Sequence, residues 1–432
     1  MSSIQLNPLK EGLSGNLSVP GDKSISHRAV IFSALAEGTS HITNFLTGED
    51  CLRTVQAFRE FGVEIERKGK EVTIYGKGIN ALQTPTQPIN FGNSGTTARL
   101  LSGVLAALPH FSTAFGDASL SKRPMDRVVL PLREMGAKIS GREEARLLPL
   151  AFEGRELTGA TIEMSVKSAQ VKSALLLAGM LAEGETNVIE KGTTRNHTEM
   201  LMSEYGIHIQ KEGQKLTIQG NQQPKSSDLR VPGDISSAAF FLVAAAITSG
   251  SSILIEGVGL NPTRNGIITA LEQMGADIKT EETGRVGHEP VGNVSIKSSK
   301  LNGITLEGDL IPNLIDEIPI IALAATQAEG QTVIKDAGEL KVKETNRIDS
   351  VVFNLRALGA DIEATEDGMI INGPVNLNGG TVNSYGDHRI GMMGAIASYI
   401  AEGPVEIINP KSIDISYPEF FEHFNEIQKK TS

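Results

Sequence analysis

The segment from Val19 to Arg28 combines residue types that bind phosphate groups. Its Pro-Gly-Asp run indicates a turn that ends in a good N-cap residue, so we expect a helix to begin near Ser24. In that helix His27 and Arg28 lie three and four residues after Ser24 and share one face. Together with Lys23 and the helix-end amides, these side chains predict a site for a multiply charged anion. We interpret His27 itself as a packed or helix-surface side chain rather than a catalytic one.

Two further segments of the first half have a similar character. The run from Asn93 to Arg99 contains small residues that let a ligand approach the backbone amides, and a tight turn with N-caps explains it equally well. It lacks the Gly-Lys-Ser/Thr of a P-loop. The loop from Ser121 to Arg127 is basic, and Arg123 beside a proline suits either bidentate anion binding or a solvated loop.

The second half of the chain adds carboxylates to the cations. Asp316 and Glu317 open an apolar segment, and we expect one of them to cap its helix. The run from Lys343 to Arg347 predicts the start of another helix, with Glu344 between two cations four residues apart; a surface ion-pair helix is the alternative. The run from Gly386 to Arg389 starts the last long helix. Glu344 stays ionised unless it is desolvated, so it can shuttle a proton only where water is excluded.

The composition limits the class of protein. The 432 residues carry a net charge of −11, with 4% aromatic residues and no tryptophan, which argues against a surface for nucleic acid or anionic membrane. One cysteine excludes an internal disulfide and fits a reducing compartment. We find neither a secretory signal nor an apolar run that could span a membrane, so we expect a soluble cytoplasmic protein. No histidine, cysteine and carboxylate set has metal-ligand spacing, and we expect no metal.

Internal repeats set the expected architecture. Five segments share a helix, a glycine and a strand, with the glycines at positions 62, 136, 206, 275 and 359, and a degenerate copy runs from Phe421 to Ile427. A glycine between a helix and a strand is typical of a C-cap. Each repeat also opens with a polar cluster and an apolar helix, which indicates burial, whereas the strands alternate and keep one wet face. We therefore expect six units in two domains, with the helices inside and the sheets outside.

A repeated Val-Pro-Gly-Asp sequence, at residues 19–22 and 231–234, predicts where the chain crosses between the domains. We expect one domain of residues 20–234 and another of residues 1–19 with 235–432, completed by the N-terminal strand. If symmetry relates the repeats, the helix N-termini face a cleft between the domains, each with about half a positive charge. We expect the active site in this cleft. The alternative is that the polar clusters are ordinary N-caps facing separate patches of solvent.

Taken together, these motifs resemble the 5-enolpyruvylshikimate-3-phosphate synthase family of enolpyruvyl transferases over essentially the whole chain. The Asn93–Arg99, Lys343–Arg347 and Asp387–Arg389 runs are specific to that family in combination. The resemblance implies an α/β (α+β) fold: a two-domain inside-out α/β barrel of six β-α-β-α-β-β repeats, three in each domain. It also implies transfer of the enolpyruvyl group of phosphoenolpyruvate to the 5-hydroxyl of shikimate 3-phosphate, with release of phosphate. This addition–elimination step belongs to aromatic amino acid biosynthesis and uses neither a metal nor an organic cofactor. We expect a monomer with small-molecule substrates and without nucleic-acid or membrane partners.

The resemblance also implies which residues bind and react. For shikimate 3-phosphate the expected ligands are Lys23, Ser24, Arg28, Ser168, Ala169, Gln170, Arg195, Asp316 and Lys343. For phosphoenolpyruvate they are Lys23, Asn93, Gly95, Arg123, Gln170, Arg347, His388, Arg389 and Lys411. The expected catalytic residues are Lys23, Asp316 and Glu344. Glu344 is expected to deliver a proton to the methylene carbon, while Asp316 and Lys23 assist removal of the hydroxyl proton.

Several segments depart from the best-known bacterial pattern. Ala169 stands where that pattern has a second serine, and the Arg195–Glu199 and Asn261–Arg264 runs resemble the bacterial subgroup that includes glyphosate-tolerant members. Ala169 cannot donate a side-chain hydrogen bond, so we expect Arg195 to compensate. Gly95 is not the alanine of some tolerant enzymes, which leaves tolerance open.

Two other functions compete with this interpretation. The sister enzyme that transfers enolpyruvyl to UDP-N-acetylglucosamine resembles the same repeat fold, but many of its members use a cysteine in the loop that here runs from Asp117 to Arg127 without one. A non-catalytic anion-binding protein of two domains is the other. The carboxylates Asp316 and Glu344 among the cations are superfluous for binding anions alone.

Overall fold

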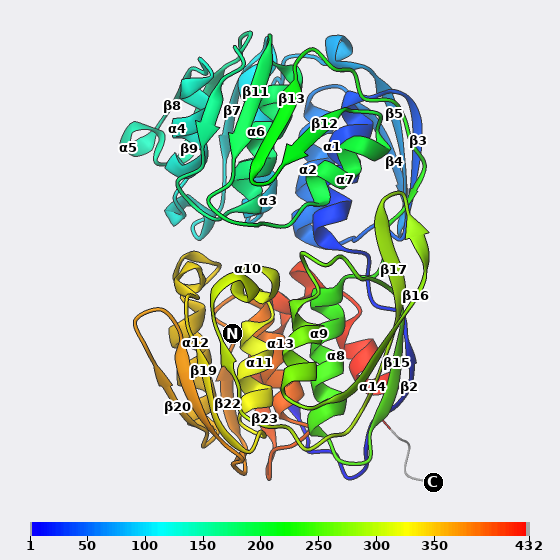
Figure 1. The fold of residues 1–432 in the computed structure, drawn as a ribbon, viewed down its shortest axis with the longest axis vertical. Coiled ribbons are helices and arrows are strands. Elements are labelled where there is room, and N and C mark those ends of the chain that lie inside the picture. Colours follow the sequence, from blue (N-terminus) through cyan, green and yellow to red (C-terminus); the bar gives the residue numbers. More distant parts are fainter. Residues whose placement is uncertain (1, 429–432) are drawn as a thin grey trace. The chain divides into compact units, whose positions relative to one another are not determined.

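A computed structural model describes residues 2–428 of the chain (Figure 1). The residues form two compact units. Unit 2 comprises Gly21–Val231 and Arg285–Glu289, and unit 1 comprises Met1–Pro20, Pro232–Gly284 and Pro290–Ser432. Each unit buries a hydrophobic core of its own, so each holds its site residues on a packed scaffold.

Unit 2 alternates helices with short strands. Its helices are α1 (Lys23–Leu35), α2 (Glu49–Glu60), α3 (Gly95–Ala107), α4 (Asp126–Glu134), α5 (Arg142–Ala145), α6 (Ala169–Leu181), α7 (His197–Glu204) and the 3-10 turns η1 (Ile79–Ala81) and η2 (Leu120–Lys122). Its strands are β3 (Glu37–Thr43), β4 (Glu64–Lys68), β5 (Glu71–Lys77), β6 (Ile89–Asn90), β7 (Phe111–Phe115), β8 (Ile139–Gly141), β9 (Leu147–Glu153), β10 (Thr161–Glu163), β11 (Glu185–Ile189), β12 (Ile209–Glu212), β13 (Lys215–Gln219) and β14 (Leu229–Arg230).

Three four-stranded sheets enclose the apolar helices of unit 2. Their orders are β14-β3-β5-β4, β6-β7-β9-β8 and β10-β11-β13-β12. In each sheet one parallel pair, such as β14 with β3, adjoins two antiparallel pairs. The central helix α3 packs on both α1 and α6, and nearly every residue of these three helices is buried. The predicted alternation holds in β5, where every second residue is buried.

Unit 1 repeats this plan. Its helices are α8 (Ile235–Ile247), α9 (Gly266–Gln273), α10 (Ile311–Leu314), α11 (Ile318–Ala325), α12 (Arg347–Ala357), α13 (His388–Ala397), α14 (Phe420–Glu426) and the 3-10 turns η3 (Gly308–Leu310), η4 (Gly338–Val342) and η5 (Pro410–Ile415). Its strands, of which β16 and β17 extend into Arg285–Glu289, are β1 (Ser3–Leu6), β2 (Ser14–Leu17), β15 (Ser252–Gly259), β16 (Asp277–Val286), β17 (Glu289–Lys297), β18 (Thr305–Leu306), β19 (Gly330–Ile334), β20 (Asp361–Ala364), β21 (Met369–Gly373), β22 (Gly380–Asn383) and β23 (Val405–Ile408).

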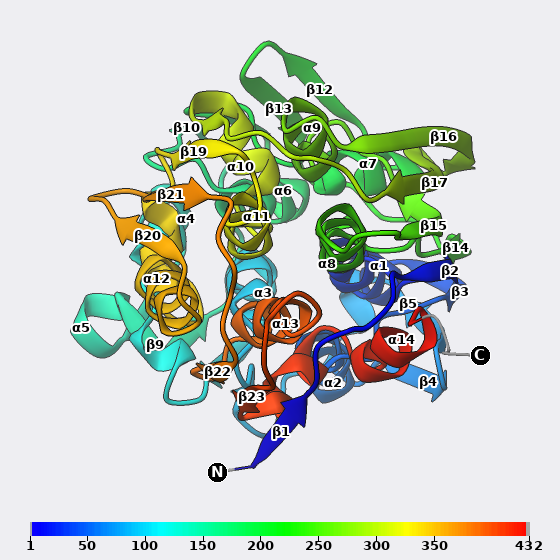
Figure 2. The same ribbon diagram turned by 90° about the horizontal axis from the view of Figure 1, so that it is seen from below.

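The apolar helices α8, α11 and α13 stand at the centre of unit 1 and pack on one another (Figure 2). Around them lie sheets with the orders β16-β17-β15-β2, β18-β19-β21-β20 and β1-β23-β22. The N-terminal strands complete two of these sheets, because β2 pairs with β15 and β1 pairs with β23. The α/β class and the arrangement of helices inside and sheets outside are confirmed, and the sheets of the described residues remain open rather than closing into a β-barrel.

The repeat glycines end their helices as predicted. All five have positive φ angles, between 75° and 93°, which a side chain disfavours: Gly62, Gly136, Gly206, Gly275 and Gly359. The left-handed residue turns the chain from each helix directly into the next strand. The glycine pattern therefore fixes the length of each repeat's second helix.

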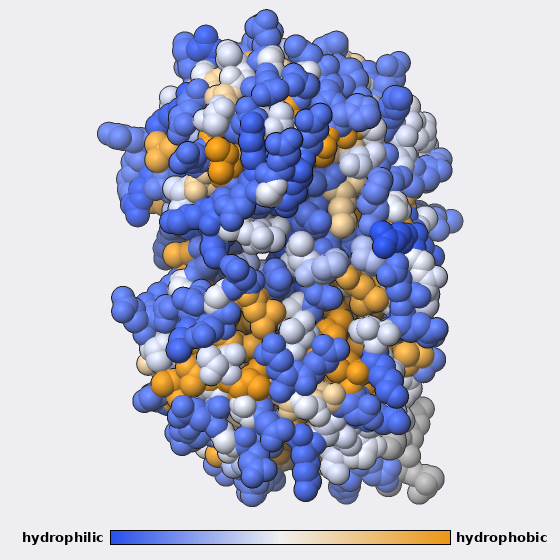
Figure 3. Space-filling view, viewed as in Figure 1, coloured by the Kyte–Doolittle hydropathy of each residue, from blue (hydrophilic) through white to orange (hydrophobic). Residues whose placement is uncertain are grey.

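Hydrophilic residues cover most of the visible face of each unit, with smaller hydrophobic patches between them (Figure 3). Within residues 2–428, none of the helices combines the length and apolar character that crossing a bilayer requires.

Candidate functional site

In unit 2 the first anion-binding segment forms the predicted helix start. Asp22 is the N-cap of α1, and its carboxylate accepts a 2.8 Å hydrogen bond from the amide of Ile25. Lys23 is the first residue of α1, and its ammonium lies 3.0 Å from Asp50 of α2. The lysine is thereby held at the helix N-terminus, where the helix dipole and the ammonium both favour an anion.

Of the two non-catalytic alternatives for His27, a packed and a helix-surface side chain, the structure shows the packed one. It is fully buried, and its Nδ1 lies 2.7 Å from the hydroxyl of Thr54. Burial, with smaller contributions from Lys23 and Arg28, holds the pKa of His27 well below its ordinary value of 6.5. The imidazole is therefore neutral at neutral pH. Thr54 in turn bonds Thr97 of α3 at 2.8 Å, so His27 helps to join α1, α2 and α3.

Arg28 is 5% exposed and is held by three elements of unit 2. Its Nε donates to Thr198 of α7 and its Nη2 donates to Ser173 of α6, both at 2.7 Å. Its Nη1 donates to the carbonyl of Ser24 at 2.9 Å. The predicted face shared by Ser24 and Arg28 is present. The sequence did not indicate the two hydroxyl partners, because 145 and 170 residues separate them from Arg28.

The Asn93–Arg99 segment begins α3 and meets the basic loop. Ser94 caps the helix, accepting from the amide of Thr97. Asn93 accepts a 2.9 Å hydrogen bond from Arg123, so the loop and the helix start are brought together as expected. A Cβ added to Gly95 would lie 3.0 Å from Nη1 of Arg123. Glycine thus lets the guanidinium lie against the helix start.

The N-terminal end of α6 joins the same group of elements. Ser168 caps α6, accepting from the amide of Val171, and Ala169 is its first residue. Gln170 accepts a 2.7 Å hydrogen bond from Arg99 and donates to Thr96 at 3.0 Å, which links α6 to α3. These contacts place an amide and a guanidinium side by side.

Arg195 lies in the segment immediately before α7 and is partly buried. The next-but-one residue, His197, begins α7, and its Nε2 lies 3.8 Å from a carboxylate oxygen of Glu289. Arg195 thus lies in the connection between β11 and α7.

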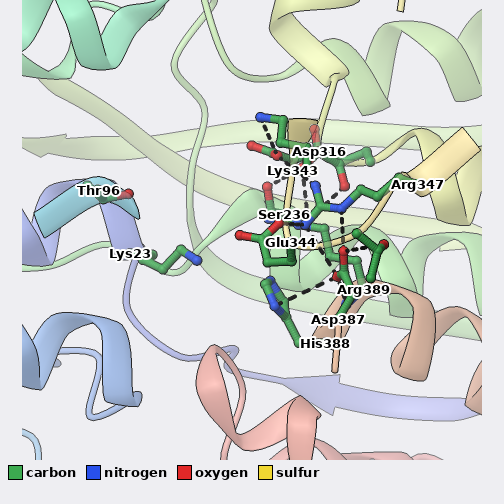
Figure 4. A network of polar contacts seen from close by, with 12 residues as sticks. Lys23, Thr96, Ser236, Asp316, Lys343, Glu344, Arg347, Asp387, His388 and Arg389 are labelled. Carbon is green, nitrogen blue, oxygen red and sulfur yellow. Dashed lines mark hydrogen bonds and ion pairs between the residues drawn. The ribbon is translucent and has the colours of Figure 1, made fainter. Parts of the chain in front are cut away.

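Unit 1 gathers the second set of predicted residues around one carboxylate (Figure 4). Asp316 lies just before α11 and accepts a 3.2 Å hydrogen bond from Arg347. The ammonium of Lys343 and the guanidinium of Arg264 each lie 3.5 Å from its oxygens. Three cations from three segments thus surround one partly exposed carboxylate, and their contacts fix its position.

Arg347 is the best anchored cation of this cluster. Its Nε and Nη2 donate to Asp387 at 2.7 and 3.3 Å, and its Nη2 also donates to Glu344 at 2.6 Å. Only 1% of the side chain is exposed. Burial disfavours the charged form, but Asp387, Glu344 and Asp316 outweigh it and raise the pKa of Arg347. Glu344, 18% exposed, is thereby attached to a permanent cation.

Arg389 and His388 begin α13, with Asp387 as the N-cap. Arg389 donates to the backbone carbonyl of Asp316 at 2.9 Å and lies 3.6 Å from the buried carboxylate of Glu317. His388 is 1% exposed, with Nδ1 3.9 Å from Asp387. The helix start therefore presents a guanidinium beside the carboxylate cluster.

Lys343 provides a second kind of cation. Its side chain is 24% exposed, yet burial lowers the pKa of Lys343, more than Asp316 raises it. An ammonium with a lowered pKa gains more from a bound anion than a fully hydrated one.

Two helix starts lie where they were predicted but differ in detail. Helix α12 begins at Arg347 with Asn346 as its N-cap, so Lys343 and Glu344 precede it, because the Asn346 side chain accepts from the amide of Asp349 and sets the boundary there. Glu317 occupies the N-cap position of α11 but makes no capping hydrogen bond with its side chain. Its carboxylate instead accepts from the hydroxyl of Ser236.

Lys411 is not joined to the others. It is exposed on η5, and within residues 2–428 it makes no hydrogen bond or ion pair with the unit 1 cluster. Its predicted role as a phosphoenolpyruvate ligand comes from the family resemblance.

Four residues without a predicted site role also belong to the unit 1 cluster around Asp316 and Arg347: Asp234, Ser236, Arg264 and Asp387. Arg264 donates to Ser236 at 2.6 Å and lies 3.3 Å from Asp234. The second Val-Pro-Gly-Asp turn contains Asp234 and was the available signal. In the described part of the chain, no group of three or more His, Cys, Asp or Glu side chains is arranged to hold a metal ion.

Comparison with known proteins gives a consistent result. The family model described as EPSP synthase (3-phosphoshikimate 1-carboxyvinyltransferase) matches residues 9–424. A protein of Bacillus thuringiensis subsp. konkukian named 3-phosphoshikimate 1-carboxyvinyltransferase is 55% identical over 429 residues, which cover 99% of this chain and 100% of the relative. A relative of the same name from Bacillus cereus is 54% identical over 429 residues, with 99% and 100% covered.

Solved structures agree with this result. A structure of EPSP synthase from Acinetobacter baumannii superposes with a TM-score of 0.89 at 45% identity, covering 99% of this chain and 98% of the other. A second structure of EPSP synthase from that organism gives 0.88 at 43% identity, with both chains covered completely. The chain therefore belongs to the EPSP synthase (3-phosphoshikimate 1-carboxyvinyltransferase) family.

Proposed function

We propose that the chain transfers the carboxyvinyl group of phosphoenolpyruvate to the 5-hydroxyl of shikimate 3-phosphate and releases phosphate. Family membership over residues 9–424 and the names of the relatives support this activity. The observation that carries it is the unit 1 cluster, in which Asp316 and Glu344 lie directly beside Arg347. A site for anions alone needs the cations, whereas a reaction that moves protons also needs the carboxylates.

The residues of unit 2 supply most of the proposed shikimate 3-phosphate site. Lys23, Ser24 and Arg28 lie at the start of α1, and Ser168 and Gln170 lie at the start of α6. Arg195, Ala169, Asp316 and Lys343 complete the assignment. Helix-end amides and forked guanidinium groups match the geometry of a phosphate ester.

Phosphoenolpyruvate carries a carboxylate and a phosphate, and it is assigned to Arg123, Arg347 and Arg389. Arg123 is supported by the hydrogen bond from its guanidinium to Asn93 and by its closeness to Gly95. Arg347 is supported by three carboxylates that keep it charged and fixed. Lys23, Gln170, His388 and Lys411 are further proposed ligands of the same substrate.

The proposed chemistry assigns two proton transfers. In the addition step the 5-hydroxyl oxygen bonds to C2 of phosphoenolpyruvate while the methylene carbon C3 gains a proton, which Glu344 delivers. Asp316, assisted by Lys23, takes the hydroxyl proton. In the elimination step the C2–O bond to phosphate breaks and C3 returns a proton, which restores the vinyl group. Because Glu344 is bonded to Arg347 at 2.6 Å, its protonated form requires the exclusion of water.

We further propose that both clusters act on the same pair of substrates, in a cleft between a domain of residues 20–234 and one of residues 1–19 with 235–432. Shikimate 3-phosphate is assigned to Lys23 and Lys343 together, which requires one molecule to contact both clusters. Holding both substrates makes the reaction effectively unimolecular. We also propose that this cleft closes when the substrates bind, and small-angle scattering profiles that stay unchanged at saturating substrate contradict that closure.

One assay tests the proposed function directly. Purified protein is incubated with phosphoenolpyruvate and shikimate 3-phosphate, and released phosphate is measured, with UDP-N-acetylglucosamine as the alternative acceptor. Release with the first acceptor and none with the second is the expected result; the reverse identifies the sister transferase instead. In D2O, recovered phosphoenolpyruvate acquires deuterium at C3 only if addition is reversible. The monomeric state, cytoplasmic location, absence of a cofactor and place in the glyphosate-tolerant subgroup stay predictions.

A further inference from the structure

Two neighbouring polar contacts join α6 to α7, and none of the four residues has a role in the proposed reaction. Lys172 lies 2.6 Å from Glu199, and Ser173 lies 2.6 Å from Thr198. All four side chains are buried, Lys172 completely. We call these four residues the α6–α7 seam. A buried cation and a buried hydroxyl pair are costly unless they are fully bonded, so their partners indicate what the seam holds.

The hydroxyl pair holds Arg28 in one orientation. Ser173 donates to the carbonyl of Ala169 at 2.6 Å, which uses its single hydrogen. Thr198 must therefore donate to Ser173. Ser173 then accepts from Thr198 and from Nη2 of Arg28, while Thr198 accepts from Nε of Arg28. Only one assignment of donors and acceptors satisfies both hydroxyls, and in it they fix the planar guanidinium of Arg28 at two nitrogens.

Lys172 holds the segment that carries Arg195. Its ammonium lies 3.0 Å from Glu190, 2.6 Å from Glu199 and 3.4 Å from the carbonyl of Thr194. Glu190 in turn accepts from the amide and the hydroxyl of Thr194, at 3.2 and 2.6 Å. One buried cation thus fixes both ends and the middle of residues 190–199. Arg195 directly follows Thr194, which makes three of these contacts.

We propose that the α6–α7 seam positions Arg28 and Arg195 for shikimate 3-phosphate, and that Thr198 and Lys172 are its determining residues. The inference rests on the proposed function, which assigns both arginines to that substrate. The seam residues act through the arginines and do not touch the substrate. A guanidinium already locked in its bound orientation loses little side-chain entropy when the phosphate arrives.

The part of the proposal that concerns the Ser173–Thr198 hydroxyl pair is tested with Thr198→Val, which keeps the shape of the side chain and removes its hydroxyl. The expected result is a rise of about tenfold in the dissociation constant for shikimate 3-phosphate, measured by calorimetry, with kcat changed by less than about twofold. Thr198→Ser restores the hydroxyl and is expected to bind like the wild type. Thr186→Val is the matched control, because Thr186 is equally buried, faces α6 at Gly179, and its hydroxyl makes no hydrogen bond within residues 2–428.

A double-mutant cycle with Arg28→Ala separates positioning from general damage. Thr198→Val acts through Arg28, so it is expected to add almost nothing once Arg28 is alanine. Full additivity overturns the proposal, as does wild-type affinity in Thr198→Val. If Arg28→Ala itself leaves the affinity unchanged, the assignment of Arg28 to this substrate fails and the inference falls with it. If Arg28→Ala weakens binding and Thr198→Val does not, only the inference fails.

The part of the proposal that concerns the Lys172 ion pairs is tested with two variants. Glu199→Gln leaves Lys172 paired with Glu190, and Lys172→Met is the more severe change. Both are expected to weaken shikimate 3-phosphate binding, Lys172→Met by about tenfold or more, and to speed hydrogen exchange of amides 190–199. Thermal unfolding shows whether each variant folds. If Lys172→Met does not fold, the affinity and hydrogen exchange of Glu199→Gln decide the test. Wild-type affinity and exchange in Glu199→Gln overturn this part of the proposal.

Discussion

Replacing Asp387 by asparagine isolates the charge that holds Arg347. One Asp387 oxygen accepts from Nε of Arg347 at 2.7 Å, and the other accepts from Nη2 of Arg347 and from the amide of Arg389, at 3.3 and 2.9 Å. In either orientation of the new amide, its NH2 group faces an N–H group from which the carboxylate had accepted a hydrogen bond. At least one hydrogen bond to the guanidinium of Arg347 is lost, and the remaining ones weaken because the carboxylate charge is gone.

The magnitude follows from these contacts. A hydrogen bond to a charged group contributes about 1.5–3 kcal/mol, and breaking a buried ion pair costs about 3–5 kcal/mol. Arg347 keeps Glu344 and Asp316 as partners, so we expect Asp387→Asn to lower the free energy of unfolding by about 3 kcal/mol. For a unit of this size that corresponds to a fall in Tm of roughly 6–12 °C. The misplaced guanidinium is also expected to raise the dissociation constant for phosphoenolpyruvate.

Thermal unfolding and calorimetry measure the two effects. Asp349→Asn is the control, because it is the same substitution at an exposed aspartate in the first turn of α12. We expect it to change the free energy of unfolding by no more than about 0.5 kcal/mol. If Asp387→Asn unfolds at the same temperature as Asp349→Asn and binds phosphoenolpyruvate like the wild type, the reasoning about Arg347 is refuted.

Three further predictions concern single positions. Burial lowers the pKa of His27 below 6.5, so the unfolded chain binds the proton first and the free energy of unfolding falls as pH drops below about 6.5, by up to about 1.4 kcal/mol per pH unit; His27→Gln removes this component in pH-dependent urea unfolding, and an unchanged slope contradicts it. Gly95→Ala places a Cβ 3.0 Å from Nη1 of Arg123 and 3.2 Å from Nη1 of Arg99, so KM for phosphoenolpyruvate is expected to rise about fivefold, the effect of about 1 kcal/mol of overpacking, and an unaltered KM in steady-state assays counts against it. Glu344→Ala is expected to lose most turnover while calorimetry finds shikimate 3-phosphate bound as before, and near-normal turnover removes Glu344 from proton transfer.

The sequence predicted the repeat architecture well because its signals are local. The glycines after each second helix and the apolar helices α3 and α6 depend on backbone conformation and hydrophobic pattern, which neighbouring residues determine. The start of α1 at Lys23 followed from its N-cap in the same way. These features need no knowledge of distant contacts.

The site was predicted less completely because its contacts are long-range. Arg264 and Asp387 contribute to the unit 1 cluster from elements far apart in the sequence, and no local pattern pairs them with Ser236 or Arg347. The start of α12 differs in detail for a related reason. Lys343 and Glu344 fit a helix by their spacing, but the Asn346 cap places them in the preceding turn, where both reach Asp316 or Arg347.

The strands that complete each unit come from opposite ends of its chain segment. In unit 2, β14 pairs with β3 once residue 230 has been synthesised, so that unit can finish its sheets early. In unit 1, β1 has no partner until β23 is made about 400 residues later. Strand β1 therefore stays unpaired while the residues between it and β23 are synthesised, and the sheets of unit 1 are completed later than those of unit 2.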